Sequence, residues 1–153
     1  MFELSSDAKK FLMQNKGKRI VFTNGCFDIV HVGHIAYLNH AKEQGDLLFL
    51  GLNSDQSIKR LKGSDRPINN QADRKFFLEN LKAIDFVEIF DEDTPYELIK
   101  SVLPQVLVKG GDWTPDQIVG SDIVLASGGE VKSLLFREGY STTSIIGKLQ
   151  GKQ

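Results

Sequence analysis

The chain of 153 residues has a single cysteine, Cys26, which excludes an internal disulfide framework and suits a reducing compartment. It has no apolar run approaching the roughly 20 residues of a membrane span, and residues 1–7 lack the basic and apolar regions of a secretion signal. A net charge of -1 argues against a nucleic-acid-binding surface as the main function. We therefore expect a cytoplasmic protein with no membrane or nucleic-acid partner, in which any affinity for phosphate is local.

The composition is that of an ordinary globular domain, with 41% hydrophobic and 25% charged residues. Short apolar runs alternate with helical patterns, as they do in parallel βαβ units. We expect strands over 19–24, 46–53, 85–90, 105–109 and 130–136, with helices between them. The prediction is an α/β fold: one Rossmann-like domain over residues 1–153, whose five-stranded, mostly parallel sheet has helices on both faces.

Local signals mark several helix starts. A short helix is expected to open at Ser5 or Ser6, and Thr94 and Thr114 each precede a proline, with Glu97 or Gln117 three residues on. This pattern is typical of a capping box that begins a helix, and it serves the fold rather than chemistry. Residues 62–71 are polar enough to form a mobile loop.

Two histidines stand where the first predicted strand gives way to a helix. Gly25 supplies the turn after the strand, and the helix is expected to begin at His34, three residues after His31. Backbone N–H groups and the helix dipole favour anions at such a place, and imidazole N–H groups add donors for phosphate oxygens. Gly33 lets a nucleotide lie close to the backbone. The pattern predicts a site for a nucleoside triphosphate.

Three other interpretations of this loop compete with that one. The histidines could be metal ligands with Cys26 as a third, although zinc prefers three or four protein ligands and His40 lies two helical turns further on. They could be core histidines, although an apolar face would not need the glycine between them. A dinucleotide-binding turn requires G-x-G-x-x-G, which this loop lacks.

Ligands of open parallel sheets bind beyond the carboxyl ends of the strands, and the loops predicted there carry phosphate-binding chemistry. Lys62, followed by Gly63, is expected on a loop that folds over a triphosphate. Arg74 could pair with the acid beside it or contact a substrate phosphate. Ser141 could cap the last helix and also bind an anion with its neighbours. The candidate residues after the second, fourth and fifth strands are Asn53, Lys62, Lys109, Gly111, Asp112, Trp113, Tyr140, Ser141, Thr142 and Thr143.

The run G-x-F-D-x-x-H-x-G-H from Gly25 to His34, together with the Tyr-Ser-Thr-Thr run at 140–143, resembles nucleotidyltransferases that share an H-x-G-H signature. Segments 23–28, 60–63, 66–69, 72–74, 108–112 and 138–143 are similar, more narrowly, to the adenylyltransferase of ADP-heptose synthesis. In that family ATP and D-glycero-β-D-manno-heptose 1-phosphate give ADP-heptose, a lipopolysaccharide core precursor, and pyrophosphate. Many members fuse this domain to a sugar kinase, so the resemblance implies a separate kinase here and, as is common in the superfamily, a homodimer.

The chemistry and the resemblance together assign roles. A sugar 1-phosphate is already a charged nucleophile, so no strong general base is required. His31, His34 and Lys62 would be catalytic, stabilising charge on the phosphates, and Mg²⁺ would screen the ATP; no protein metal site is expected. The nucleotide would contact Asn24, Gly25, Cys26, Phe27, Gly33, Lys109, Gly111, Asp112, Tyr140, Ser141, Thr142 and Thr143. The sugar phosphate or the adenosine would lie near Asp28, Asn53, Arg74 and Trp113.

Two rival functions remain at this point. Cytidylyltransferases that act on glycerol 3-phosphate resemble the chain in the same histidine and Ser-Thr-Thr motifs. A non-catalytic nucleotide-binding module would belong to another class, although such a protein often loses one of the catalytic residues, and here both histidines and Lys62 are present.

Overall fold

Five parallel strands form one sheet in the order β3-β2-β1-β4-β5. The computed structural model describes residues 1–136 and 142–151. The strands are β1 (Ile20–Gly25), β2 (Leu47–Asn53), β3 (Phe86–Phe90), β4 (Val106–Gly110) and β5 (Glu130–Leu134). All five predicted strands are confirmed to within two residues at each end, and the sheet is wholly parallel rather than mostly parallel.

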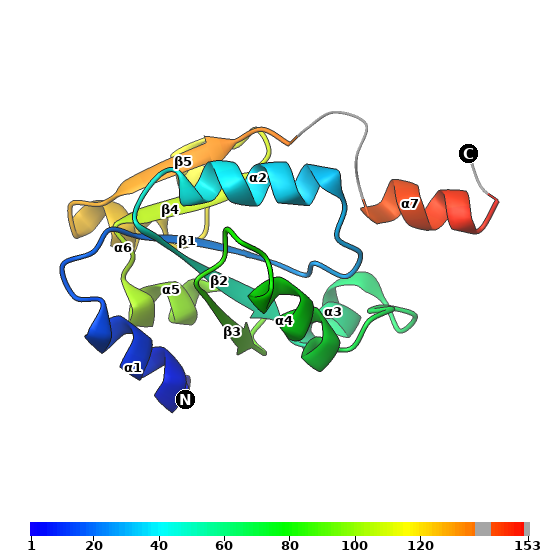
Figure 1. Ribbon diagram of the computed structural model, residues 1–153, viewed down its shortest axis with the longest axis horizontal. Coiled ribbons are helices and arrows are strands. Elements are labelled where there is room, and N and C mark those ends of the chain that lie inside the picture. Colours follow the sequence, from blue (N-terminus) through cyan, green and yellow to red (C-terminus); the bar gives the residue numbers. More distant parts are fainter. Residues whose placement is uncertain (137–141, 152–153) are drawn as a thin grey trace.

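Helices cover both faces of this sheet, as predicted (Figure 1). Helices α2 (Val32–Lys42) and α4 (Gln71–Glu79) pack on one face, and α1 (Ser6–Gln14), α5 (Tyr96–Val102) and α6 (Ser121–Ala126) pack on the other. The remaining helices are α3 (Asp55–Lys62), the 3-10 turn η1 (Pro115–Gln117) and α7 (Thr142–Leu149). Across residues 1–136 and 142–151, no helix is long and apolar enough to cross a membrane.

The core consists of two layers, because successive side chains of a strand point to opposite faces. In β1, Val21 packs with Leu38 of α2 in one layer, whereas Phe22 packs with Ile99 of α5 in the other. All four are at most 1% exposed. Burying such a side chain stabilises the fold by about 1.5–3 kcal/mol. The unbroken apolar runs of the central strands are thus explained by a sheet that is covered on both sides.

The strand order reverses between β1 and β4, and this places the site. After β1 the chain adds β2 and β3 on one side, and it then crosses to the other side to add β4 and β5. The register pairs Val21 with Val106, so that Gly25 and Gly110 end their strands at the same edge of the sheet. Such a switch point leaves a crevice between the loops that follow the two strands.

Three helix starts differ from the prediction. Helix α2 begins at Val32 rather than at His34, because His31 already acts as its N-cap. Helix α5 begins after Pro95, which itself occupies the N-cap position, so the Thr94 capping box is wrong. The Thr114 capping box is present as predicted, but it begins only the 3-10 turn η1, which ends at Gln117 because Ile118, with φ -94° and ψ 121°, is extended.

Candidate active site

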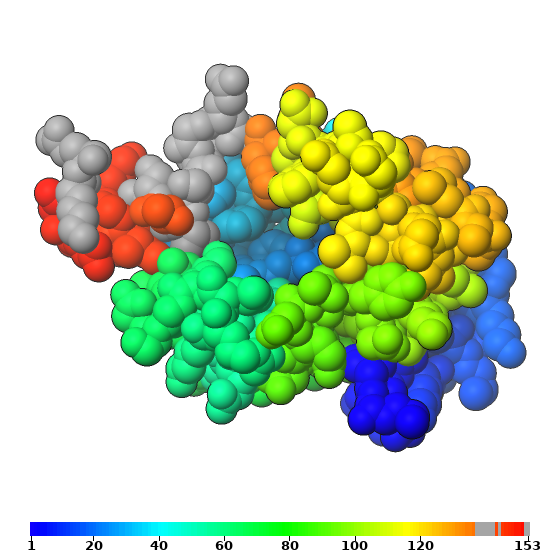
Figure 2. All heavy atoms as spheres, turned by 180° about the vertical axis from the view of Figure 1, so that it is seen from behind, coloured from blue at the N-terminus to red at the C-terminus, as the bar shows by residue number. Residues whose placement is uncertain are grey.

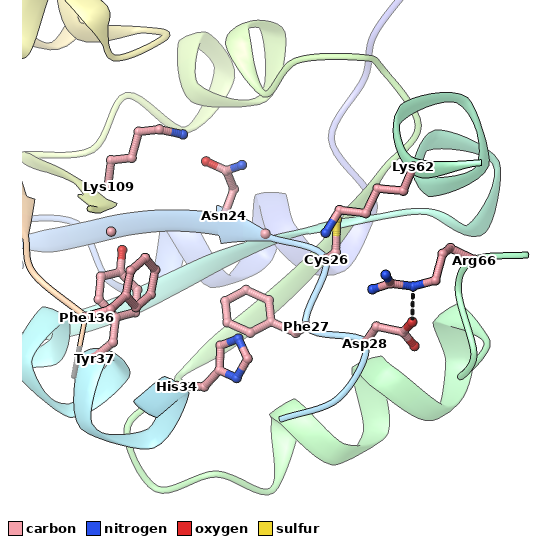
Figure 3. A pocket seen from close by; sticks show the side chains of 12 residues that line it. Asn24, Cys26, Phe27, Asp28, His34, Tyr37, Lys62, Arg66, Lys109 and Phe136 are labelled. Carbon is pink, nitrogen blue, oxygen red and sulfur yellow. Dashed lines mark hydrogen bonds and ion pairs between the residues drawn. The ribbon is translucent and has the colours of Figure 1, made fainter. Parts of the chain in front are cut away.

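A cavity of about 210 Å³ lies at the carboxyl ends of β1 and β4. In the space-filling view (Figure 2) it is a hollow with the blue atoms of the β1 region at its base, between the green atoms around α3 and the yellow atoms that follow β4. Four separate parts of the chain contribute to its wall. The lining residues are Asn24, Gly25, Cys26, Phe27, Asp28, His34, Tyr37, Lys62, Arg66, Lys109, Gly110 and Phe136 (Figure 3).

The two histidines are fixed by hydrogen bonds to the backbone of their own helix turn. Nδ1 of His31 accepts the N–H of Gly33 at 3.1 Å, and Nδ1 of His34 accepts the N–H of His31 at 3.2 Å. A neutral ring that accepts at Nδ1 carries its proton on Nε2, so both rings are Nε2–H tautomers. Their centroids are 4.0 Å apart. Gly33 is buried at the second position of α2, where its N–H completes this turn.

Both imidazoles are held in the neutral state. Burial, then the neighbouring His31 and Lys62, lower the pKa of His34 to about 4, and burial also lowers the pKa of His31. Neutral rings can donate from Nε2–H near pH 7 without carrying charge. In the part of the chain that the structure describes, no group of three or more His, Cys, Asp or Glu side chains could hold a metal ion. The tautomers and the lowered pKa values thus arrange the pair as neutral hydrogen-bond donors.

Phe27 packs against His34 and has an unusual backbone conformation. Its φ is 48°, in the left-handed region that bulky residues rarely adopt. The phenyl ring packs 5.4 Å from the His34 ring, centroid to centroid, and Phe27 is only 8% exposed. A Cβ at position 25 would lie 2.8 Å from this ring, which is why a glycine precedes it. Strain of this kind persists where the surroundings enforce it, and it is common at functional sites.

Three cationic side chains reach the same cavity from other parts of the chain (Figure 3). Lys62 is exposed and is the last residue of α3 rather than part of a loop; Gly63, with a φ of 107°, ends the helix after it. Arg66 comes from the segment that joins α3 to α4. Lys109 comes from β4, and its Nζ lies 5.0 Å from the ring centroid of Trp113. Together they make the cavity attractive to an anion.

The loop after β4 is closed by Trp113. Its indole N–H donates to the carbonyl of Gly110 at 3.0 Å, and its backbone N–H donates to Oγ of Ser133 at 3.0 Å. Gly111 has a φ of 116°, and a Cβ there would lie 2.6 Å from the indole nitrogen. Trp113 and Asp112 are exposed beside the cavity but do not line it.

Arg74 is buried, 2% exposed, and its guanidinium contacts protein oxygens on every side. Nε donates to the carbonyl of Asn69 at 2.9 Å, and Nη1 donates to the carbonyls of Cys26 and Asn53, both at 2.8 Å. Nη2 forms an ion pair with Asp55 at 2.8 Å, rather than with the acid beside it in the sequence. Arg74 thus ties the loop after β1 to the loop after β2, and a contact with substrate stays a prediction that would require some of these bonds to break.

Asp28 and Asn53 are also engaged within the protein. Asn53 is 5% exposed, lies outside the cavity lining and donates from Nδ2 to Oγ of Ser57 at 3.0 Å. Asp28 lines the cavity but is 3% exposed. Burial tends to raise the pKa of Asp28, but the backbone N–H groups of Asn69 and Ile68, with the Arg66 side chain, lower it below its usual value. Roles for both residues in substrate binding stay predictions.

Two of the four Tyr-Ser-Thr-Thr candidates lie within the described residues. Tyr140 and Ser141 lie outside the described residues. Thr142 and Thr143 are the first residues of α7, as predicted for a helix start, and Thr143 is exposed. A contact of these residues with nucleotide phosphates remains a prediction.

Sequence reasoning missed four lining residues: Tyr37, Arg66, Gly110 and Phe136. Tyr37 lies one helical turn after His34, a spacing that places both on one face of α2. Its hydroxyl group lies 2.6 Å from that of Thr23, and burial raises the pKa of Tyr37 to about 12. The Phe136 ring packs 5.0 Å from the Tyr37 ring and covers Gly110, where a Cβ would overlap it. Of these four residues, two had a signal in the sequence by which they could have been found. Tyr37 has a helical spacing from His34, and Arg66 follows the basic residues Lys59, Arg60 and Lys62.

The known proteins that resemble this chain include two that are named bifunctional protein HldE. The chain is 58% identical over 138 residues to the bifunctional protein HldE of a Nitratiruptor species, and 61% identical over 137 residues to that of a Marinomonas species. Each match covers 90% of this chain but 29% of the relative, so the chain spans less than a third of the length of these relatives.

A solved structure with the same fold is the lipopolysaccharide core biosynthesis protein of Thermoplasma volcanium. It is 29% identical, with a TM-score of 0.65, and the match covers 82% of this chain and 100% of that one. The family model described as cytidylyltransferase-like matches residues 22–148, which include most of β1, the paired histidines and most of α7. The chain therefore belongs to the cytidylyltransferase-like family.

Proposed function

We propose that this protein is an adenylyltransferase that transfers AMP from ATP to D-glycero-β-D-manno-heptose 1-phosphate, giving ADP-heptose and pyrophosphate. The observation that carries the proposal is the pair of neutral Nε2–H histidines, of which His34 lines a cavity that Lys62, Arg66 and Lys109 make cationic and His31 packs against His34. The heptose substrate is supported by the motifs similar to the adenylyltransferase of ADP-heptose synthesis. It is further supported by 58% and 61% identity to proteins named HldE, and by the likeness to a lipopolysaccharide core biosynthesis protein.

The reaction would be a direct displacement at the α-phosphorus of ATP. An oxygen of the sugar 1-phosphate forms a bond to this phosphorus, and the bond to the β-phosphate oxygen breaks, so that pyrophosphate leaves with the electron pair. The nucleophile is already anionic, so no protein base is needed. His31 and His34 would donate to oxygens on which negative charge develops, and Lys62 would hold the phosphates.

Mg²⁺ is proposed to accompany the triphosphate and screen its charge. Asp28 is the carboxylate among the described lining residues, and it already accepts from Arg66, Ile68 and Asn69. The fitting arrangement is therefore a Mg²⁺ ion held by phosphate oxygens and water, which is common for this ion. The contacts of ATP with the predicted nucleotide-binding residues and of the sugar with Trp113 belong to the same proposal.

Pyrophosphate release tests the proposal. The purified chain would be assayed with ATP or CTP, each in the presence of heptose 1-phosphate, glycerol 3-phosphate or no acceptor. We expect turnover with ATP and heptose 1-phosphate and little in the other mixtures. Turnover restricted to CTP and glycerol 3-phosphate would support a cytidylyltransferase for that substrate, and nucleotide binding without turnover in any mixture would support a non-catalytic module.

We further propose that this protein acts with a separate sugar kinase, forms a homodimer and is cytoplasmic. The relatives are named bifunctional and are much longer than this chain, which is in keeping with a sugar kinase that supplies the 1-phosphate as a separate activity in the same pathway. We also propose a homodimer, which light scattering of the purified chain would test. A cytoplasmic location follows from the use of ATP as donor, and cell fractionation would test it.

A further inference from the structure

Arg66 is the cation of the cavity that the sequence did not select, and it is also the one whose orientation is fixed. Its side chain is 16% exposed, and Nε donates to Oδ2 of Asp28 at 3.1 Å. We infer that Arg66 is a further phosphate-binding residue of this site and that Asp28 is the residue that positions it. The inference rests on the proposed function, because the phosphate belongs to one of the two substrates of that reaction.

The acceptor that holds Arg66 is itself held rigidly. The carboxylate of Asp28 accepts the backbone N–H groups of Ile68 and Asn69, each at 2.8 Å. In return, Nδ2 of Asn69 donates to the backbone carbonyl of Asp28 at 2.6 Å. The loop after β1 and the segment between α3 and α4 are thereby tied together at the cavity wall. An arginine bound through Nε to such a carboxylate has little freedom to turn.

The bond to Asp28 leaves the other end of the guanidinium available. Figure 3 shows the two terminal nitrogens of Arg66 pointing away from its own backbone, on the cavity side of the Asp28 carboxylate. In the described ranges 1–136 and 142–151 these nitrogens have no hydrogen-bond or ion-pair partner, whereas both terminal nitrogens of Arg74 are bound to protein oxygens. A planar guanidinium binds two phosphate oxygens at once, so Arg66 has the geometry for an anion that Arg74 lacks.

Variants of both residues test the inference. Arg66→Gln removes the cation. Arg66→Lys keeps the positive charge but lacks the planar guanidinium that binds two oxygens at once, and Asp28→Asn removes the charged acceptor. We expect Arg66→Gln to raise the KM of either ATP or heptose 1-phosphate by about 10- to 100-fold, the loss typical of one hydrogen bond to a charged group. Arg66→Lys recovers part of the loss. Asp28→Asn raises the KM of the same substrate, and the double variant is no worse than Arg66→Gln because both changes act through one side chain.

The chain offers a matched control in Arg60→Gln. Arg60 pairs with Asp93 on the surface and lies outside the cavity lining, so both KM values should stay at those of the wild type. If Asp28→Asn does not fold, Asn69→Ala replaces it: loss of the bond to the Asp28 carbonyl should raise the same KM by a smaller factor. Wild-type KM values in Arg66→Gln would overturn the phosphate-binding role, and additive effects in the double variant would overturn the positioning role.

A binding measurement separates this inference from the proposed function. Calorimetric titration with inorganic pyrophosphate and inorganic phosphate requires no turnover and no particular sugar. We expect Arg66→Gln to bind at least one of these probes about 10-fold more weakly than the wild type and Arg60→Gln to bind both normally. A wild-type chain that bound these anions without forming ADP-heptose would contradict the proposed function but leave this test intact. Equal binding by Arg66→Gln and the wild type would overturn the inference.

Discussion

His34→Asn is the substitution that separates the fold from the chemistry. The amide oxygen of asparagine stands near the place of Nδ1, so it can still accept the N–H of His31, a bond of 3.2 Å in the protein. The donor at Nε2 is lost. Removal of one preorganised donor to developing charge typically lowers kcat by about 10²–10³-fold, or about 2.7–4 kcal/mol. The capping bond is worth about 1 kcal/mol, so even its complete loss would lower Tm by only about 2–4 °C in a chain of this size.

The assay is pyrophosphate release at saturating ATP and heptose 1-phosphate, with thermal unfolding measured on the same samples. His34→Gln is the matched variant, because its amide nitrogen stands near the place of Nε2 and can still donate; it should retain more activity than His34→Asn. Near-normal kcat in His34→Asn would refute the role of His34 at the phosphates. A collapse of Tm in both variants would instead favour a core histidine.

Three further predictions follow from the contacts described above. Lys62→Ala should lower kcat/KM with little change in Tm, because Lys62 is exposed at the end of α3; wild-type kinetics would remove it from the site. Arg74→Met should reduce the free energy of unfolding by about 3–5 kcal/mol in urea titrations, because it leaves Asp55 and three backbone carbonyls, of which that of Asn53 is buried, without their donor; unchanged stability with a raised KM would instead indicate a substrate contact. The pKa of His34 is lowered to about 4, so between that pH and about 6.5 the unfolded chain binds more protons than the folded protein does. The Tm should therefore fall as the pH falls through this window, and it should fall less in His34→Asn. Equal slopes of Tm against pH in the two proteins would contradict the lowered pKa.

The strands and their order of appearance could be predicted, because a sheet covered on both faces leaves apolar runs that local patterns reveal. Phe22 and Phe49 lie in such runs and are fully buried. The paired histidines could be found for a similar reason, since His31, Gly33 and His34 are neighbours in sequence and make their defining hydrogen bonds with each other.

The roles of the buried polar residues could not be predicted in this way. Arg74 donates to carbonyls that lie 48 and 21 positions away, and Asp28 accepts from amides 40 and 41 positions away. Backbone groups carry no sequence signal, so a residue that binds them looks the same in the sequence as one that binds substrate. The Thr114 capping box is confirmed, but it begins only a 3-10 turn, because the backbone is already extended at Ile118.

The central claim is that the phosphate of the sugar attacks the α-phosphorus of ATP. The most direct test is mass spectrometry of the products formed from ATP and heptose 1-phosphate whose phosphate oxygens carry ¹⁸O. We expect ADP-heptose that retains all of this label, together with unlabelled pyrophosphate. Label in the pyrophosphate, or the absence of any ADP-linked heptose, would contradict it.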